Sequence, residues 1–349
     1  MDYQLRQYGR ASLDFAAEIA GQIGVKARPV AEAVRAAGLD EESLAEDLDS
    51  RDQQILDIAG RMAGFRVSNL CRDWYCNNHG QIAIRAFEEM GEAFACGLDQ
   101  GLSGPTTLDP NPAYQPPSWW TDHWIHRTHG GWDGHPYMGF VYGELIHGYL
   151  VSRIASGDID AQRWALADSL PDIGSGRVLE IGCSSGQFTR VLARRHPDAD
   201  ITACDISIRQ LEQAQRTLNA MGATVKLIKC SGEDTGLEAD SFDVVASYAI
   251  LHEIPVDVTE RTFRETYRVL KPGGLTVFGD VPPYEELDKF MQWKADFGAR
   301  NEGEPFWRES ATLDVRALLQ DIGFVEIERF GMTDGPYPFP YVTRARKPG

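Results

Sequence analysis

The sequence predicts an α/β fold in its C-terminal half, preceded by a mainly helical region. From about Asp172 onward, short apolar runs typical of buried strands alternate with stretches of helical periodicity. Strands separated by helices require right-handed crossovers and therefore a mainly parallel sheet. Upstream, apolar residues recur at spacings of three and four, as on one face of a helix. We therefore expect a helical domain over 1–157 and an α/β domain over 158–349.

The α/β half contains seven expected strands. The first four cover 177–183, 201–207, 225–230 and 242–251, and the last three cover 275–281, 324–330 and 341–347. Helices are expected between them over 188–196, 208–220, 260–270 and 313–322. Pro272, Gly273 and Gly274 follow the third of these helices and should end it.

The N-terminal half contains helical patterns over 13–23, 29–39, 52–65 and 81–94. Residues 101–137 differ, because Gly and Pro interrupt a segment dense in Trp, Tyr and His, which predicts an ordered loop. A further helix is expected from Met138 to Ala155.

The composition favours a small-molecule substrate. The 349 residues include 52 acidic and 34 basic side chains, a formal net charge of -18. Such a surface repels nucleic acid and anionic lipid, which proteins hold mainly through Lys and Arg. The longest mostly apolar run, 244–251, is too short to span a membrane. No apolar stretch follows the first basic residues, and six cysteines form no CxxC pair, so we expect a cytoplasmic protein with reduced thiols.

The segment VLEIGCSSGQF, residues 178–188, predicts a strand, a glycine loop and a helix. Gly182 and Gly186 allow a ligand to approach the backbone closely at the end of the strand. The dinucleotide fingerprint GxGxxG requires glycine at position 184, where this chain has Ser184. Glu180 would repel a pyrophosphate but suits a cationic sulfonium compound with an amino group. Asp205 closes the second strand, where a carboxylate can accept both ribose hydroxyls.

With these motifs in this order, residues 172–349 resemble the class I S-adenosylmethionine-dependent methyltransferases. The resemblance rests on residues 180–186, Asp205, residues 231–234, 242–251 and the RVLKPGG turn at 268–274. It implies a Rossmann-like seven-stranded sheet in the order 3-2-1-4-5-7-6, with the seventh strand antiparallel. It also implies S-adenosyl-L-methionine as cofactor, bound by Glu180, Gly182, Cys183, Gly186, Asp205, Ile206, Gly232, Glu233, Asp234 and Ser247. The loop departs from the family at Ser184, where a further glycine is common.

The candidate catalytic residues are His252 and Glu253, directly after the fourth strand. An imidazole titrates near neutrality and can take a proton from an enol, phenol or ammonium group. The alternative is a histidine that caps the next helix or pairs with Glu253.

Histidines and aromatic residues gather in the loop before Met138, where His123, His126, His129 and His135 lie. A metal bound with Asp122, Asp133 or Glu144 is one interpretation, but loop histidines more often make hydrogen bonds or contact substrate, so no metal site is assigned. We expect an acceptor-binding wall instead, with Arg127 as a clamp for an anion. This predicted wall consists of Trp124, Arg127, His129, Trp132 and Tyr142, and Tyr248 and Trp307 are further candidates for substrate binding. The alternative is that the aromatic residues fill the core between the domains.

The sequence thus predicts methylation of a small molecule, with His252 as general base and oxygen or carbon as the attacking atom. Methylation at sulfur or nitrogen, a nicotinamide-dependent oxidoreductase and a non-catalytic cofactor-binding module are the alternatives. The N-terminal helices are expected to form a lid or the surface of a homodimer.

Overall fold

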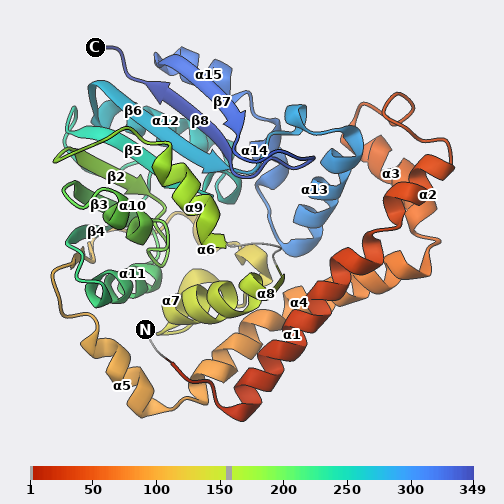
Figure 1. Ribbon diagram of the computed structural model, residues 1–349, viewed down its shortest axis with the longest axis horizontal. Coiled ribbons are helices and arrows are strands. Elements are labelled where there is room, and N and C mark those ends of the chain that lie inside the picture. Colours follow the sequence, from red (N-terminus) through yellow and green to blue (C-terminus); the bar gives the residue numbers. More distant parts are fainter. Residues whose placement is uncertain (1–2, 155–158) are drawn as a thin grey trace.

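The computed structural model describes residues 3–154 and 159–349, and its centre is an eight-stranded sheet (Figure 1). The strand order is β1-β4-β3-β2-β5-β6-β8-β7, and β8 is antiparallel to both of its neighbours. Seven strands lie in the α/β half: β2 (Arg177–Ile181), β3 (Asp200–Asp205), β4 (Val225–Lys229), β5 (Phe242–Tyr248), β6 (Leu270–Asp280), β7 (Val325–Gly331) and β8 (Tyr341–Arg346). These seven confirm the predicted order and the antiparallel last strand.

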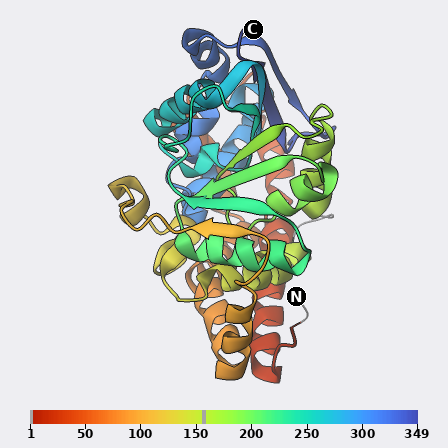
Figure 2. The same cartoon turned by 90° about the vertical axis from the view of Figure 1, so that its left-hand side faces the viewer.

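The eighth strand, β1 (Thr107–Asp109), comes from the segment expected to be a loop. It pairs in parallel with β4, with Thr107 opposite Lys226, and lies at the edge of the sheet (Figure 2). The expectation of a loop was wrong for these three residues. A strand of three residues is too short to show an alternating pattern of apolar and polar side chains. Its partner β4 also lies far away along the chain, so no local signal predicts the pairing.

Helices cover both faces of the sheet because successive strand residues point to opposite sides. Val178 packs with α10 (Thr189–Arg195) and α11 (Ile208–Ala220), whereas Leu179 packs with α12 (Val256–Val269) and α15 (Val315–Ile322). The helix α9 (Ile159–Asp168) joins the first of these layers through Leu166. These contacts hold the carboxyl ends of the strands in fixed positions.

The N-terminal half is mainly helical, as predicted. Its helices are α1 (Gln7–Ala27), α2 (Val30–Ala36), α3 (Leu48–Ala59), α4 (Ala63–Glu88), α5 (Glu92–Gln100) and α6 (Ser118–Thr121). The long helices α1 and α4 lie side by side and project from the sheet (Figures 1 and 2). The pattern over 81–94 is not one helix, because Gly91, at φ +88°, separates α4 from α5.

A helix predicted from Met138 is present and connects the two halves. It runs through α7 (Met138–Phe140), a π-helical stretch over Val141–Val151 and α8 (Ser152–Ile154), while Ala155 and the predicted domain boundary at 157 lie outside the described residues. A Cβ on Gly139 would meet the carbonyl oxygen of Arg209 at 2.0 Å, so glycine permits this helix to lie directly on α11. The aromatic-rich loop before it is thereby held over the edge of the sheet.

Two more helices follow β6, α13 (Lys289–Glu302) and α14 (Trp307–Thr312). Trp293 of α13 packs against Phe65 of α4, and its indole nitrogen donates to Asp52 of α3 at 2.8 Å. In the part of the chain that the structure describes, no helix has the length and apolarity needed to cross a membrane.

Candidate active site

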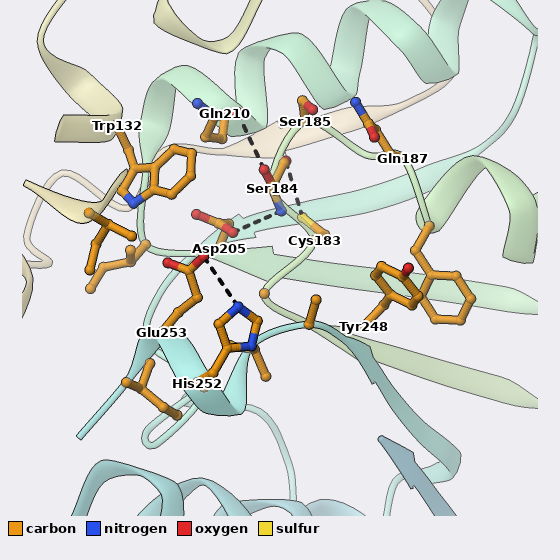
Figure 3. A pocket seen from close by; sticks show the side chains of 18 of the residues that line it. Trp132, Cys183, Ser184, Ser185, Gln187, Asp205, Gln210, Tyr248, His252 and Glu253 are labelled. Carbon is orange, nitrogen blue, oxygen red and sulfur yellow. Dashed lines mark hydrogen bonds and ion pairs between the residues drawn. The ribbon is translucent and has the colours of Figure 1, made fainter. Parts of the chain in front are cut away.

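A cavity of about 580 Å³ opens at the carboxyl ends of β2, β3, β4 and β5 (Figure 3). Its volume lies within the range of small-molecule binding sites. The loops that follow these four strands form one side. The aromatic-rich loop and the helix at 138–154 form the opposite side.

The glycine loop after β2 forms the floor of the cavity. Gly182 has φ +72°, and a Cβ there would meet Ile250 Cδ1 at 2.5 Å, so the position requires glycine. Ser184 also adopts a left-handed backbone, at φ +48°. Because a left-handed backbone is strained for any residue with a side chain, serine at this position costs about 1–2 kcal/mol relative to glycine.

Asp205, at the end of β3, holds this loop in place. One carboxylate oxygen accepts the backbone N–H of Ser184 at 2.8 Å and the other accepts that of Ser207 at 2.8 Å. Burial raises the pKa of Asp205 to about 6. Asp205 lines the cavity and each of its oxygens can accept more than one hydrogen bond, so the side chain can still accept hydroxyl groups of a ligand.

Glu180, on β2, is the most deeply buried acid of the cavity. Its side chain is almost inaccessible, with the residue only 1% exposed, and its Oε2 has no hydrogen-bond partner among the described residues. Burial raises the pKa of Glu180 to about 8. A carboxylate in such a place favours a cationic ligand, because the ligand would supply the missing partner. This observation fits S-adenosylmethionine, whose amino group and sulfonium are both cationic.

His252 is held by an acid that the sequence did not reveal as its partner. Its Nδ1 lies 2.6 Å from Asp280 Oδ1 at the end of β6, whereas its Nε2 lies 3.7 Å from Glu253 Oε1. Burial disfavours the imidazolium, but Asp280, Glu253 and Glu304 together outweigh this effect and raise the pKa of His252 to about 9. That value is above the neutral range on which the expectation of a general base relied.

His126 lies between two carboxylates. Its Nε2 is 3.2 Å from Glu253 Oε1, and its Nδ1 is 2.5 Å from Glu304 Oε1. Burial lowers the pKa of this ring, but Glu304 and Glu253 together raise it well above its ordinary value. His126, Glu253 and Glu304 are called the His126 cluster below.

Aromatic rings form the wall opposite the glycine loop. Trp132 and Tyr142 meet edge to face with centroids 4.1 Å apart. The Tyr142 hydroxyl lies 3.0 Å from His147 Nε2, a contact that the π-helical stretch makes possible because residues five apart then lie on the same face. Burial lowers the pKa of His147 to about 3, so this ring is neutral.

The structure brings most of the predicted site residues to the cavity. Those that line it are Glu180, Gly182, Cys183, Asp205, Ile206, Gly232, His252, Glu253, Trp132, Tyr142, Tyr248 and Trp307. Sequence reasoning missed Gln210, Tyr337 and Phe339, which also line it and come from segments without a recognisable motif.

Seven predicted residues do not line the cavity: Gly186, Glu233, Asp234, Ser247, Trp124, Arg127 and His129. Gly186, at φ +79°, packs against α11, and Ser247 is fully buried and donates to the Ile181 carbonyl. Glu233 forms an ion pair with Arg261, and Asp234 bridges back to Ser231.

Arg127 and His129 lie on the outer side of the aromatic-rich loop. Arg127 pairs with Asp73 at 3.0 Å, and the His129 ring packs on Trp124 with centroids 4.3 Å apart. His126 and Arg127 both have φ +54°, so the loop has no regular period that would have predicted which side chains face inward.

Comparisons with known proteins indicate a methyltransferase, in agreement with a cavity suited to a cationic cofactor. A family profile described as "Methyltransferase domain" matches residues 178–274. A ubiquinone/menaquinone biosynthesis C-methyltransferase of Desulfotalea psychrophila is 30% identical over 184 residues, covering 48% of this chain and 73% of that protein. A ribosomal RNA small subunit methyltransferase C of Hahella chejuensis is 30% identical over 174 residues, covering 49% of this chain and 45% of that protein.

A solved structure of Haemonchus contortus phosphoethanolamine N-methyltransferase 2 with S-adenosyl-L-methionine is also similar. It has a TM-score of 0.47 and 19% sequence identity, and the match covers 62% of this chain and 58% of that one. The profile match and the relative covered over most of its length establish the family. The chain belongs to the class I S-adenosylmethionine-dependent methyltransferases.

Proposed function

We propose that this methyltransferase acts on a small molecule and methylates an oxygen or carbon atom that bears a proton. One observation carries the proposal: the carboxylates suited to the cofactor and the imidazole of His252 line the same cavity. A methyl acceptor bound against the aromatic wall would therefore lie between the cofactor and a group able to take its proton.

The cofactor would be held by the loops after β2, β3 and β4. In this proposal Glu180 faces the cationic end of S-adenosylmethionine, Asp205 accepts the ribose hydroxyls, and the backbone around Gly232 flanks the adenine. When bound, S-adenosylmethionine supplies a methyl group that is already electrophilic. The protein's task is then to position the acceptor, exclude water and remove a proton.

His252 is the proposed proton acceptor, and Asp280 positions it. The hydrogen bond from Nδ1 to Asp280 leaves Nε2 as the nitrogen that can take a proton from the acceptor. A cationic ligand in the same poorly solvated cavity disfavours the imidazolium, because like charges repel each other. The cofactor's presence would thus help His252 to become the neutral base.

A small acceptor agrees better with this chain than RNA does, although the relatives include enzymes of both kinds. The net charge of -18 opposes binding of a phosphate backbone. The wall around Trp132 and Tyr142 is apolar and aromatic, as in sites for small, flat molecules.

The test measures release of S-adenosylhomocysteine with a panel of phenols, enols and carboxylic acids, and with 16S ribosomal RNA as the competing substrate class. We expect turnover with a member of the small-molecule panel. His252→Gln should then lower kcat by about 10²- to 10⁴-fold, while the Kd for S-adenosylmethionine does not rise, because the substitution removes a positive charge from the cavity. His135→Gln is the matched control, because His135 packs on Phe87 outside the cavity. Turnover with RNA alone would refute the proposed acceptor class, and unchanged kcat in His252→Gln would refute the base.

A further inference from the structure

We propose that the His126 cluster is a binding site for one divalent transition-metal ion. The proposed function does not require such an ion, and no metal site was assigned from the sequence. One ligand atom from each of His126, Glu253 and Glu304 can be chosen so that all three lie within 4.8 Å of one another. These residues form a compact set with one imidazole and two carboxylates.

The second oxygen of Glu304 points to an ion independently of this spacing. The Glu304 side chain is only 6% exposed, and its Oε2 has no hydrogen-bond partner among the described residues. A buried carboxylate oxygen without a partner is costly, and a bound metal ion would supply that partner. Glu253 and His126 are 19% and 31% exposed and line the cavity, so an ion would have a path of entry.

Three separate segments build the cluster, and the backbone joins two of them. The N–H of His126 donates to the carbonyl of Gly303 at 3.0 Å, which ties the aromatic-rich loop to the end of α13. Gly303 has φ +90°, and a Cβ there would meet the backbone nitrogen of Arg127 at 2.9 Å. Glycine at this position therefore allows the loop to place His126 beside Glu304, while Glu253 arrives from the turn after β5.

The ligand set selects among metals. Imidazole with carboxylates suits Mn²⁺, Fe²⁺, Co²⁺ or Zn²⁺, whereas Mg²⁺ and Ca²⁺ prefer oxygen ligands alone. Metal–ligand bonds of about 2.1 Å place neighbouring ligand atoms about 3 Å apart. The 3.2 Å between His126 Nε2 and Glu253 Oε1 already fits that spacing. Glu304 would have to turn from Nδ1 of the ring toward the ion.

Three protein ligands leave coordination positions open, and these would face the cavity beside Trp132. A methyl acceptor with a phenolate, enolate or carboxylate oxygen could fill one of them. This last step, unlike the metal site itself, rests on the proposed function.

The experiment uses the full chain after dialysis against EDTA. MnCl₂ is titrated and followed by electron paramagnetic resonance, and ZnCl₂ is titrated and followed by calorimetry, each with and without S-adenosylmethionine. We expect one metal site per chain, and pulsed measurements on the Mn²⁺ complex should show a signal from a coordinated imidazole nitrogen. The affinity for the metal ion should be at least about tenfold lower in Glu253→Gln, Glu304→Gln and His126→Asn. Glu212→Gln is the control, because Glu212 pairs with Arg209 on α11 away from the cluster.

Because the chain is strongly acidic, stoichiometry alone would not identify the site. The proposal is overturned if no single site is found, if the bound Mn²⁺ shows no imidazole nitrogen, or if the three cluster variants bind as the wild type does. In that case His126 is an imidazolium held between two carboxylates. Release of S-adenosylhomocysteine with the small-molecule panel is measured on the metal-free protein as well, so failure of the metal site is distinguishable from failure of the proposed function.

Discussion

Glu180 should destabilise the protein in the absence of its cofactor, and replacing it with glutamine measures by how much. Burial in the folded protein raises the pKa of this carboxyl from 4.5, the value taken for the unfolded chain, to about 8. Between these two values the folded chain keeps a proton that the unfolded chain releases. Stability therefore falls as the pH rises from about 4.5 to about 8 and stays low above that range.

The size of the effect follows from the same shift. At about 1.4 kcal/mol for each pH unit, the ionised Glu180 lowers the free energy of unfolding by up to about 5 kcal/mol above pH 8, and by about 3 kcal/mol at pH 7. Glu180→Gln keeps the shape of the side chain but cannot ionise. We expect the variant to be more stable than the wild type by several kcal/mol at pH 8 and by less than about 1 kcal/mol at pH 5.

Urea unfolding from pH 5 to pH 8.5 measures the difference between the two proteins. Exposed Glu42 supplies the control, because Glu42→Gln should follow the wild type at every pH. The same carboxylate should bind the cationic cofactor, so calorimetry should show affinity for S-adenosylmethionine that rises with pH in the wild type. In Glu180→Gln it should be at least about tenfold weaker at pH 8, consistent with the loss of a charged hydrogen bond. Parallel pH curves for wild type and Glu180→Gln would refute the reasoning, and so would equal affinities for the cofactor.

Two further predictions concern the scaffold. Gly186→Ala combines a left-handed backbone with a new Cβ 2.9 Å from that of Ala214. It should therefore lower the free energy of unfolding clearly more than Gly174→Ala, which at φ +52° has open space and should cost about 1–2 kcal/mol. Equal losses of this free energy in urea unfolding would contradict the packing argument. Asp296 is buried and accepts from Arg308 Nε at 2.6 Å, so Asp296→Asn should cost about 3 kcal/mol at pH 7. Burial opposes the carboxylate, but Arg308 and Arg300 keep the pKa of Asp296 below 3.8, so this difference should shrink as the pH falls below that value. A loss independent of pH would exclude these ion pairs as its cause.

Local pattern was sufficient for the seven strands of the α/β half and for the positions of Gly182 and Asp205 at strand ends, whereas four of the residues expected to bind the cofactor do not line the cavity. Gly182 and Asp205 lie at the ends of their strands, and the carboxyl ends of parallel strands always meet at one edge of a sheet. Their proximity therefore does not depend on how the rest of the chain folds. The strand β1 escaped prediction because three residues carry no period and only their pairing with β4 makes them a strand.

The strands, the crossovers, the glycine loop and the acids that suit a cationic cofactor could all be predicted from the residues, because each depends on neighbours within a few residues or on the common edge of the sheet. Three arrangements could not be predicted in this way: Asp280 holds His252, Glu253 and Glu304 enclose His126, and Arg127 points away from the cavity. These partners come from segments far apart along the chain, and the loop that carries His126 and Arg127 has no repeating geometry. Contacts of that kind depend on how the helices pack on the sheet, which no local pattern of residues records.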